Sequence, residues 1–369
     1  MMRFFQKITN IIYFKFIFLF KNNFSNLVLV TDGAKWILDK QTLMLKNFLK
    51  KRLLFKNKIY HSTHSPHKQF VYFLDQYQIL KKSFFINKNV VALDYLHGIS
   101  KFNNNNKKLL TFVRKNQKYI KIIRVTNSFF KNYLISSGIE KSKIITIPIP
   151  VDINFFKIKK KILTYFKTKY SIPHDKFIVG SFQKDGIGWG MGDVAKFIKG
   201  PDILIKILIT IKKKIPNLHV LLTGPARGYL VSKLKKNKIS FSYLGSIGEF
   251  EMPYAYASSD LYLVSSRDEG GPMSIFESMA VGTPVVSTKV GHAHDHIKNY
   301  HNGFAAKINS VRDLSAFVYK IYNNEKLRKK IIKNGKLTAK NNTINKQKKW
   351  ITFFKIYFGD RYKFFTKIK

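Results

Sequence analysis

Short apolar runs bounded by turn residues alternate with amphipathic segments through the C-terminal half of the chain. The runs predict buried strands at residues 176–182, 218–224, 239–244, 261–266 and 284–287. Helical spacing predicts helices over residues 203–211 and 273–281, each opened by a glycine and a proline. Alternation of strand and helix through residues 176–320 is typical of a parallel, doubly wound sheet, which binds ligands over the carboxyl ends of its strands.

The N-terminal half carries a weaker version of the same pattern. Buried strands are predicted at residues 27–30, 90–94, 120–126 and 143–149, and a helix is predicted from Trp36 onward. The run Asn103 to Lys108, NNNNKK, predicts a surface loop. We therefore expect a second domain of the same α/β type.

The segment Ser265 to Ser287, SSRDEGGPMSIFESMAVGTPVVS, holds the most specific chemistry. A strand that passes through a glycine turn into a helix directs the unbonded N–H groups of the first helical turn above the sheet, where a phosphate fits. Glu277 falls among apolar positions of the helix, so we expect it to be half-buried and to need donors, which sugar and ribose hydroxyls supply. Only 20 of 369 residues are acidic, yet Asp268, Glu269 and Glu277 lie within ten positions. This pattern predicts a nucleotide-sugar site.

The segment resembles the retaining glycosyltransferases of family 4, the glycosyl transferases group 1. That family has two glutamates separated by seven residues and then A-x-G-x-P-V-V, which is filled here by Glu269, Glu277, Ala280, Gly282, Pro284, Val285 and Val286. The resemblance implies the GT-B fold, in which two doubly wound Rossmann-like domains face each other across a cleft. It also implies that Glu269 holds donor-sugar hydroxyls, that Glu277 holds the ribose, and that the amides near Gly270, Gly271 and Met273 face sugar and diphosphate.

Two lysines match basic positions of the resembled family, whose members bind the donor diphosphate there. Lys199 matches the lysine before a glycine, and Lys184 takes by position the place of the usual arginine. Lys184 departs from the pattern, because lysine offers a point charge where arginine offers a planar fork. Between them, the loop DGIGWGMGD (residues 185–193) lacks the spacing of a dinucleotide fingerprint and is interpreted as either a mobile flap beside the donor or a flexible surface insert.

Further residues are candidates through the resemblance. Gly245 and Ser246, in the loop that ends at Gly248, are candidates for main-chain contact with the nucleotide base. His97 follows a strand and is a candidate catalytic residue facing the scissile bond; the competing interpretation is a packed or capping histidine. Asp32 and Gly33 are candidates for the acceptor side.

The histidines at positions 292, 294 and 296 invite a metal interpretation, but their spacing matches no zinc motif. We expect an ordinary solvated loop there, with contact to donor phosphate as the alternative. No metal is expected to be required, because Lys199 and the helix amides can balance the diphosphate charge. No bound cofactor is expected, since the nucleoside-diphosphate sugar is a substrate.

The resemblance also predicts the domain organisation. Residues 1–160 would form the N-terminal acceptor-side domain and residues 161–345 the C-terminal donor domain. Residues 346–369, which are aromatic and basic, would form a last helix that returns to the N-terminal domain.

The formal charge of +47 would ordinarily indicate a polyanion as partner. Only 9 of the 67 basic residues are Arg, and Lys, Asn, Ile, Phe and Tyr are abundant, as an A+T-rich coding sequence produces. We therefore expect no specific nucleic acid, and a basic face that meets anionic lipid or an acidic glycan. The chain has no Cys, so it has no disulfides.

The most apolar run, Ile11 to Phe20, contains Lys15 and is well short of the roughly 20 residues that span a bilayer. No cleavage site for a secretory signal follows it. Residues 1–22 are interpreted either as a helix on the membrane surface or as an element packed on the first domain. The need for nucleotide sugars favours the cytoplasm, with peripheral attachment to the inner face of the membrane as a possibility of the first interpretation.

The predicted function is retaining transfer of a sugar from a nucleoside-diphosphate sugar to the hydroxyl of a glycan or glycolipid, in the synthesis of surface polysaccharide or lipopolysaccharide. Two alternatives stay open at this point. One is a GT-B nucleotide-sugar epimerase, and the other is a noncatalytic basic protein that binds membranes or polyanions on the same fold.

Overall fold

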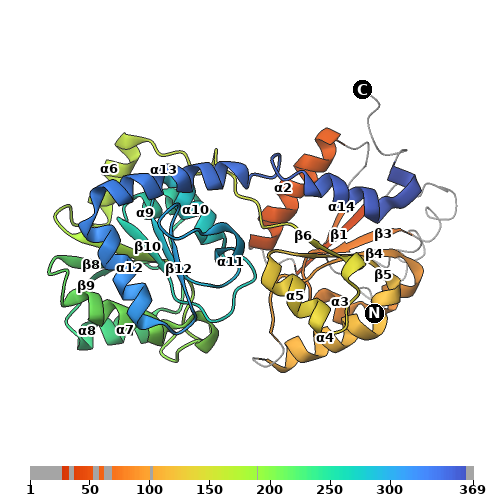
Figure 1. Ribbon diagram of the computed structural model, residues 1–369, viewed down its shortest axis with the longest axis horizontal. Coiled ribbons are helices and arrows are strands. Elements are labelled where there is room, and N and C mark those ends of the chain that lie inside the picture. The colour runs from red at the N-terminus through yellow and green to blue at the C-terminus, as the bar shows by residue number, and fades with distance from the viewer. Residues whose placement is uncertain are drawn as a thin grey trace, which may run out of the picture. The chain divides into compact units, whose positions relative to one another are not determined.

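The computed structural model describes residues 27–32, 37–52, 58–61, 69–99, 103–188 and 190–362 (Figure 1). The strands are β1 (Leu27–Thr31), β2 (Lys58–His61), β3 (Phe70–Phe73), β4 (Val90–Asp94), β5 (Ile120–Val125), β6 (Ile144–Thr146), β7 (Phe177–Ser181), β8 (Leu218–Leu222), β9 (Ser240–Tyr243), β10 (Leu261–Val264), β11 (Val285–Thr288) and β12 (Phe304–Ala306). The helices are α2 (Ile37–Arg52), α3 (Gln78–Lys81), α4 (Asn104–Asn116), α5 (Ser128–Ser136), α6 (Lys160–Lys169), α7 (Pro201–Lys212), α8 (Gly228–Lys236), α9 (Met252–Ala257), α10 (Met273–Val281), α11 (Ala293–His296), α12 (Val311–Asn323), α13 (Glu325–Asn341) and α14 (Lys349–Phe358). The α/β class predicted from the sequence is confirmed.

Two six-stranded sheets organise these elements, with the strand orders β2-β1-β3-β4-β5-β6 and β12-β11-β10-β7-β8-β9. The strand pairs β1–β3, β3–β4, β7–β8 and β10–β11 are parallel, with registers such as Val179 opposite Val220 and Leu263 opposite Val286. In the second sheet the strand order reverses between β7 and β10. Open parallel sheets bind their ligands at such a reversal, outside the carboxyl ends of the strands.

Strand β10 shows how the second sheet is buried on both faces. Leu261 and Leu263 belong to the core cluster that includes α7, α8 and α12, whereas Tyr262 and Val264 belong to the cluster that includes α9 and α10. This follows from the alternation of side chains along a strand. Figure 1 shows α7 and α8 on one side of these strands and α9 and α10 on the other. The continuous apolar run in the sequence is thereby explained.

The first sheet is likewise built from buried strands. Every residue of β1 and of β3 is buried. The C-terminal helix supplies aromatic partners: Tyr357 and Phe358 lie 5.4 and 4.8 Å from Phe70 between ring centroids, and the Tyr357 hydroxyl donates to the Val90 carbonyl.

The prediction of a surface loop at NNNNKK is wrong, because these residues begin helix α4. Asn103 has an extended backbone, and its side chain accepts a hydrogen bond from the Asn105 amide, which makes it an N-cap. Asn106, Leu109 and Val113 form the buried face of the helix. The asparagine run concealed both the cap and the 3.6-residue period.

By their contacts, the described residues fall into two compact units, one within residues 1–93, 118–121 and 355–369 and the other within residues 94–117 and 122–354. The contacts described below all lie within the second unit. The three-part domain division stays a prediction. Gly33 and residues 1–22 lie outside the described residues, and Asp32 is exposed. None of the described helices has the length and apolar character needed to cross a membrane.

Candidate active site

The loop between β7 and α7 ends at Gly200, directly after Lys199. Phe197–Lys199 forms a 3-10 turn, and Gly200 follows with φ of 62° as the residue before Pro201. A Cβ on Gly200 would lie 2.1 Å from the Ser265 carbonyl oxygen, so only glycine fits. At Gly200, the start of α7 therefore packs closely against the backbone that follows β10.

Lys199 and Glu269 meet at the reversal of strand order. The Lys199 Nζ lies 2.5 Å from Glu269 Oε1, and the side chains are 22% and 14% exposed. Ser266 Oγ also donates to Glu269 Oε1, at 2.9 Å. The structure thus brings together two residues predicted from separate motifs.

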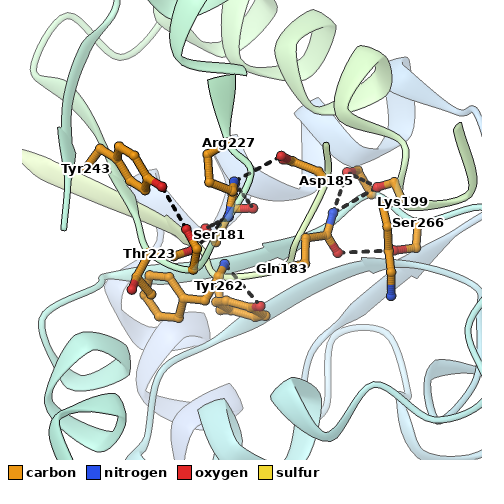
Figure 2. Close-up of polar contacts among 12 residues, drawn as sticks. Ser181, Gln183, Asp185, Lys199, Thr223, Arg227, Tyr243, Tyr262 and Ser266 are labelled. Carbon is orange, nitrogen blue, oxygen red and sulfur yellow. Dashed lines mark hydrogen bonds and ion pairs between the residues drawn. The ribbon is translucent and has the colours of Figure 1, made fainter. Parts of the chain in front are cut away.

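Gln183 forms hydrogen bonds with both the loop after β7 and the loop after β10 (Figure 2). Its Nε2 donates to the Lys199 carbonyl at 2.8 Å, and its Oε1 accepts from Ser266 Oγ at 3.1 Å. The bonds fix the backbone of one loop against a side chain of the other. Sequence reasoning missed Gln183, because an isolated glutamine carries no motif.

Lys184 and Lys199 share their surroundings with a third lysine, Lys196. The pKa of Lys196 is lowered by burial and then by the neighbouring charges of Lys199 and Lys184, while Glu269 acts in the opposite direction. Three lysines against the carboxyl groups of Asp268 and Glu269 leave an excess of positive charge, which favours an anionic ligand. Lys196 was missed because it lies between the glycine-rich run and the Lys-Gly pair and matches neither.

The loop from Asp268 to Pro272 presents backbone donors. Within the described residues, no acceptor takes a hydrogen bond from the amides of Gly271, Met273 or Ser274, and the Pro272 cap makes no side-chain bond to the first turn of α10. A helix start with unbonded amides favours an anion. These donors include two of the three predicted amide positions.

Glu277 is half-buried on α10, as expected from its position among apolar residues. The Tyr256 hydroxyl donates to Glu277 Oε2 at 2.8 Å. Burial raises the pKa of Tyr256 well above its usual value, and the charge of Glu277 adds to this, so the hydroxyl stays protonated and keeps donating. Tyr256 was missed, because no sequence signal connects it with a glutamate 21 positions later.

Asp268 is buried beside Glu269. Burial raises the pKa of its carboxyl group to about 6, even though the Ile99 amide donates to it. The same loop is held from Arg267, whose guanidinium forms a bidentate pair with Asp202 at 2.8 and 2.6 Å. Asp202 lies in the first turn of α7, so this pair also fixes the helix that follows Lys199.

His97 lies against the same loop. It is exposed, and a Cβ built on Gly270 would lie 3.1 Å from the His97 Cβ and 1.9 Å from the Leu96 carbonyl oxygen. The structure therefore brings His97 next to Glu269 and Gly270, although they are far apart in the sequence.

Gly245 and Ser246 follow β9, two strands away from β7. The Gly245 carbonyl accepts from the Gly224 amide at 2.8 Å and from Thr223 Oγ1 at 2.7 Å. No bond within the described part of the chain joins these two residues to Lys199 or Glu269. Their contact with a base stays a prediction.

The prediction of a solvated histidine loop is wrong at its first histidine. His292 is fully buried, stacks on Phe276 at 4.5 Å, and lies where a Cβ on Gly271 would come 2.7 Å from its ring. Burial lowers its pKa well below the usual value, so the ring is neutral. The ring is a packing support under Gly271, which local polarity could not reveal.

Part of this geometry lies in a segment that is similar to a known family. Residues 191–338 match the family Glycosyl transferases group 1. The match begins inside the glycine-rich loop and includes Lys196, Lys199, Gly245, Ser246 and the segment from Glu269 to Glu277. Lys184 and His97 lie outside the matched residues.

Curated relatives match over similar lengths. An uncharacterized glycosyltransferase of Methanocaldococcus jannaschii is 32% identical over 145 residues, which cover 38% of this chain and 40% of the relative. One of Haemophilus influenzae is 26% identical over 151 residues, which cover 40% and 43%. The alignments thus span less than half of each relative.

Solved structures extend the likeness of fold to most of the chain. HepE of Anabaena in complex with UDP is 15% identical, with a TM-score of 0.70 over 89% of this chain and 99% of that one. Sucrose-phosphate synthase of Thermosynechococcus elongatus is 13% identical, with a TM-score of 0.69 over 90% and 99%. The GT-B fold expected from the sequence is confirmed.

Proposed function

We propose that this protein transfers a glycosyl group from a nucleoside-diphosphate sugar to a hydroxyl acceptor, with retention of configuration. The observation that supports it best is the convergence of Lys199, its neighbouring lysines and the unbonded amides after Gly270 at the reversal of strand order, with Glu269 among them. One anionic group and one polyhydroxylated group would be bound side by side, which is the composition of a sugar diphosphate.

In the proposed reaction, the bond between the anomeric carbon and the diphosphate oxygen breaks, and the acceptor oxygen bonds to the same face of that carbon. The acceptor proton passes to the departing phosphate. Negative charge grows on the diphosphate, where Lys199, Lys184, Lys196 and the amides of Gly271 and Met273 would stabilise it. This set of positive groups supports a reaction that requires no metal.

Glu269 would hold sugar hydroxyls. Because it is paired with Lys199 at 2.5 Å, donor binding would exchange that contact: the ammonium turns to the diphosphate and the carboxylate to the sugar. Glu277, fixed by Tyr256, would hold the ribose hydroxyls. His97 would face the reacting centre from beside Gly270, and Gly245 and Ser246 would meet the base.

The sugar is proposed to be a hexose, and the donor to try first carries uridine, because HepE is solved with UDP and with UDP-glucose. For the acceptor we propose a glycan or glycolipid of the cell surface. The need for nucleotide sugars would favour a cytoplasmic protein. The excess of Lys and Arg over Asp and Glu would favour contact with the acceptor at an anionic membrane.

Calorimetry with UDP, GDP, ADP and CMP tests the donor site, with Glu277→Ala as the variant and the exposed Glu325→Ala as the control. We expect one nucleotide to raise the melting temperature. Glu277→Ala should raise its dissociation constant most, and Glu269→Ala should reduce turnover of the nucleotide sugar more. Binding of no nucleotide would contradict the proposed function. Wild-type behaviour of both Glu277→Ala and Glu269→Ala would contradict it as well.

A further inference from the structure

Two side chains from the loop after β5 bind one carbonyl group of the loop from Asp268 to Pro272, which is called the donor loop below. Asn127 Nδ2 donates to the Gly270 carbonyl oxygen at 2.7 Å, and Thr126 Oγ1 donates to the same oxygen. Asn127 Nδ2 also donates to Thr126 Oγ1 at 3.0 Å. Both side chains are fully buried. The three groups form a closed network in which each donor is directed at Gly270.

The orientation of this carbonyl decides where the next amide points. A trans peptide is planar, and its C=O and N–H point in opposite directions. With the Gly270 oxygen held by Thr126 and Asn127, the Gly271 N–H is directed away from these residues, and no acceptor within the described residues takes its hydrogen bond. A rotation of this one peptide would exchange the donor for an acceptor.

The approach of the chain at this point explains why Gly270 is needed. A Cβ on Gly270 would lie 1.9 Å from the Leu96 carbonyl oxygen. The missing side chain lets the donor loop come close enough for Thr126 and Asn127 to reach its carbonyl. The buried His292 ring packs against the next residue, Gly271, where a Cβ would lie 2.7 Å from the ring.

We propose that Thr126 and Asn127 are positioning residues, which hold the Gly270–Gly271 peptide so that the Gly271 amide faces the sugar diphosphate. The inference rests on the proposed function. Because charge grows on the diphosphate as the glycosidic bond breaks, a fixed amide stabilises the transition state more than the bound donor. Loss of the two side-chain donors therefore reduces kcat and leaves the affinity for the intact nucleotide sugar nearly unchanged.

Asn127 offers a variant that separates this role from its structural one. Its Oδ1 accepts from the Phe130 amide at 3.0 Å and caps helix α5. Asp and Asn are equally good N-caps, so Asn127→Asp keeps the cap. The same change removes the donor to Gly270 and sets a carboxylate oxygen against the carbonyl.

The experiment compares Asn127→Asp, Thr126→Val and Thr126→Ser with the wild type, using UDP-glucose turnover, the dissociation constant of UDP-glucose measured without acceptor, and the melting temperature. For Asn127→Asp we expect kcat to fall about 100-fold, in the range for loss of one fixed donor, with less than a threefold change in UDP-glucose affinity. Thr126→Val should lose less than Asn127→Asp, since Asn127 still donates, and Thr126→Ser should retain wild-type kcat.

Three outcomes would overturn the inference. Wild-type kcat in Asn127→Asp and Thr126→Val would show that the peptide needs no such support. Parallel losses of melting temperature, UDP-glucose affinity and kcat that Thr126→Ser shares would show a purely structural role. A wild type that binds none of the four nucleotides and processes no nucleotide sugar would remove the proposed function itself, and this inference with it.

Discussion

The loops after the neighbouring strands β7 and β10 are both rich in glycine, but they differ in the side chains that they expose to water. In the loop after β10, the charged residues Arg267 and Asp268 are 8% and 7% exposed. In the loop after β7, the apolar residues Ile187, Met191 and Val194 are 58%, 75% and 63% exposed. One loop therefore keeps charges away from water, and the other shows apolar side chains to it.

The glycines of the two loops differ accordingly. Gly270 is required by a backbone neighbour, the Leu96 carbonyl. In the loop after β7, Gly186 and Gly192 lie tightly against Ala226, whereas a Cβ on Gly188 or Gly190 would meet nothing within 4 Å. The base of this loop is packed and its tip is open, so only the base needs glycine for space. A role of the tip as a flap over the donor stays a prediction.

Replacing one glycine in each loop should give the largest contrast. Gly270→Ala places a methyl group on the Leu96 carbonyl, displaces the loop after β10 and should reduce turnover about 100-fold, as a shift of about 1 Å in a catalytic group does. Gly190→Ala, in open space, should change the free energy of unfolding by no more than about 0.5 kcal/mol and leave turnover intact. Equal turnover of the two variants in a steady-state assay would contradict the contrast.

The base of the loop after β7 depends on a buried ion pair. Arg227 Nε lies 3.0 Å from Asp185 Oδ1 with both side chains fully buried, and Arg227 Nη1 donates to the Ser181 carbonyl at 2.7 Å (Figure 2). Arg227→Met leaves a buried carboxylate unpaired and should cost about 3–5 kcal/mol of unfolding free energy.

Urea denaturation measures this loss, with the exposed Arg312→Met as the control. Adding Asp185→Asn to Arg227→Met removes the unpaired charge and should restore part of the stability. If Arg227→Met alone were as stable as the control, the ion pair would not stabilise the loop.

A smaller effect is expected for Asp268, the buried aspartate of the loop after β10, and only a change of pH reveals it. The pKa of Asp268 is raised from 3.8 to about 6 in the folded protein, so the unfolded state binds fewer protons between these values. Stability from the protonated carboxyl is fully present below about pH 4 and is lost as pH rises through about 6. The loss amounts to about 3 kcal/mol by pH 7.

Asp268→Asn should remove this dependence, because the amide cannot ionise. We expect its unfolding free energy to match the wild type near pH 4 and to exceed it near pH 7, while the exposed Asp360→Asn follows the wild type throughout. Parallel curves for Asp268→Asn and wild type would show that Asp268 titrates normally.

Most of the fold could be predicted because it depends on local pattern. Helix α10 begins and ends at the predicted residues, and β4 has the predicted bounds. The short strands β2, β3 and β12 were not predicted, and α4 was hidden by a run of asparagines. Short or compositionally biased segments contain too few positions to establish a period.

The sequence by itself determined the strand and helix periods, the two glutamates with their glycine turn, and the Lys-Gly pair before α7. Each of these is a spacing within one short segment, which fixes backbone conformation locally. Only the tertiary structure decided what those residues touch. Lys199 meets Glu269, Tyr256 meets Glu277, and Thr126 meets a carbonyl 144 positions later. Such contacts depend on which strands become neighbours and on where a missing Cβ lets two backbones approach, and neither is written in the spacing of any one segment.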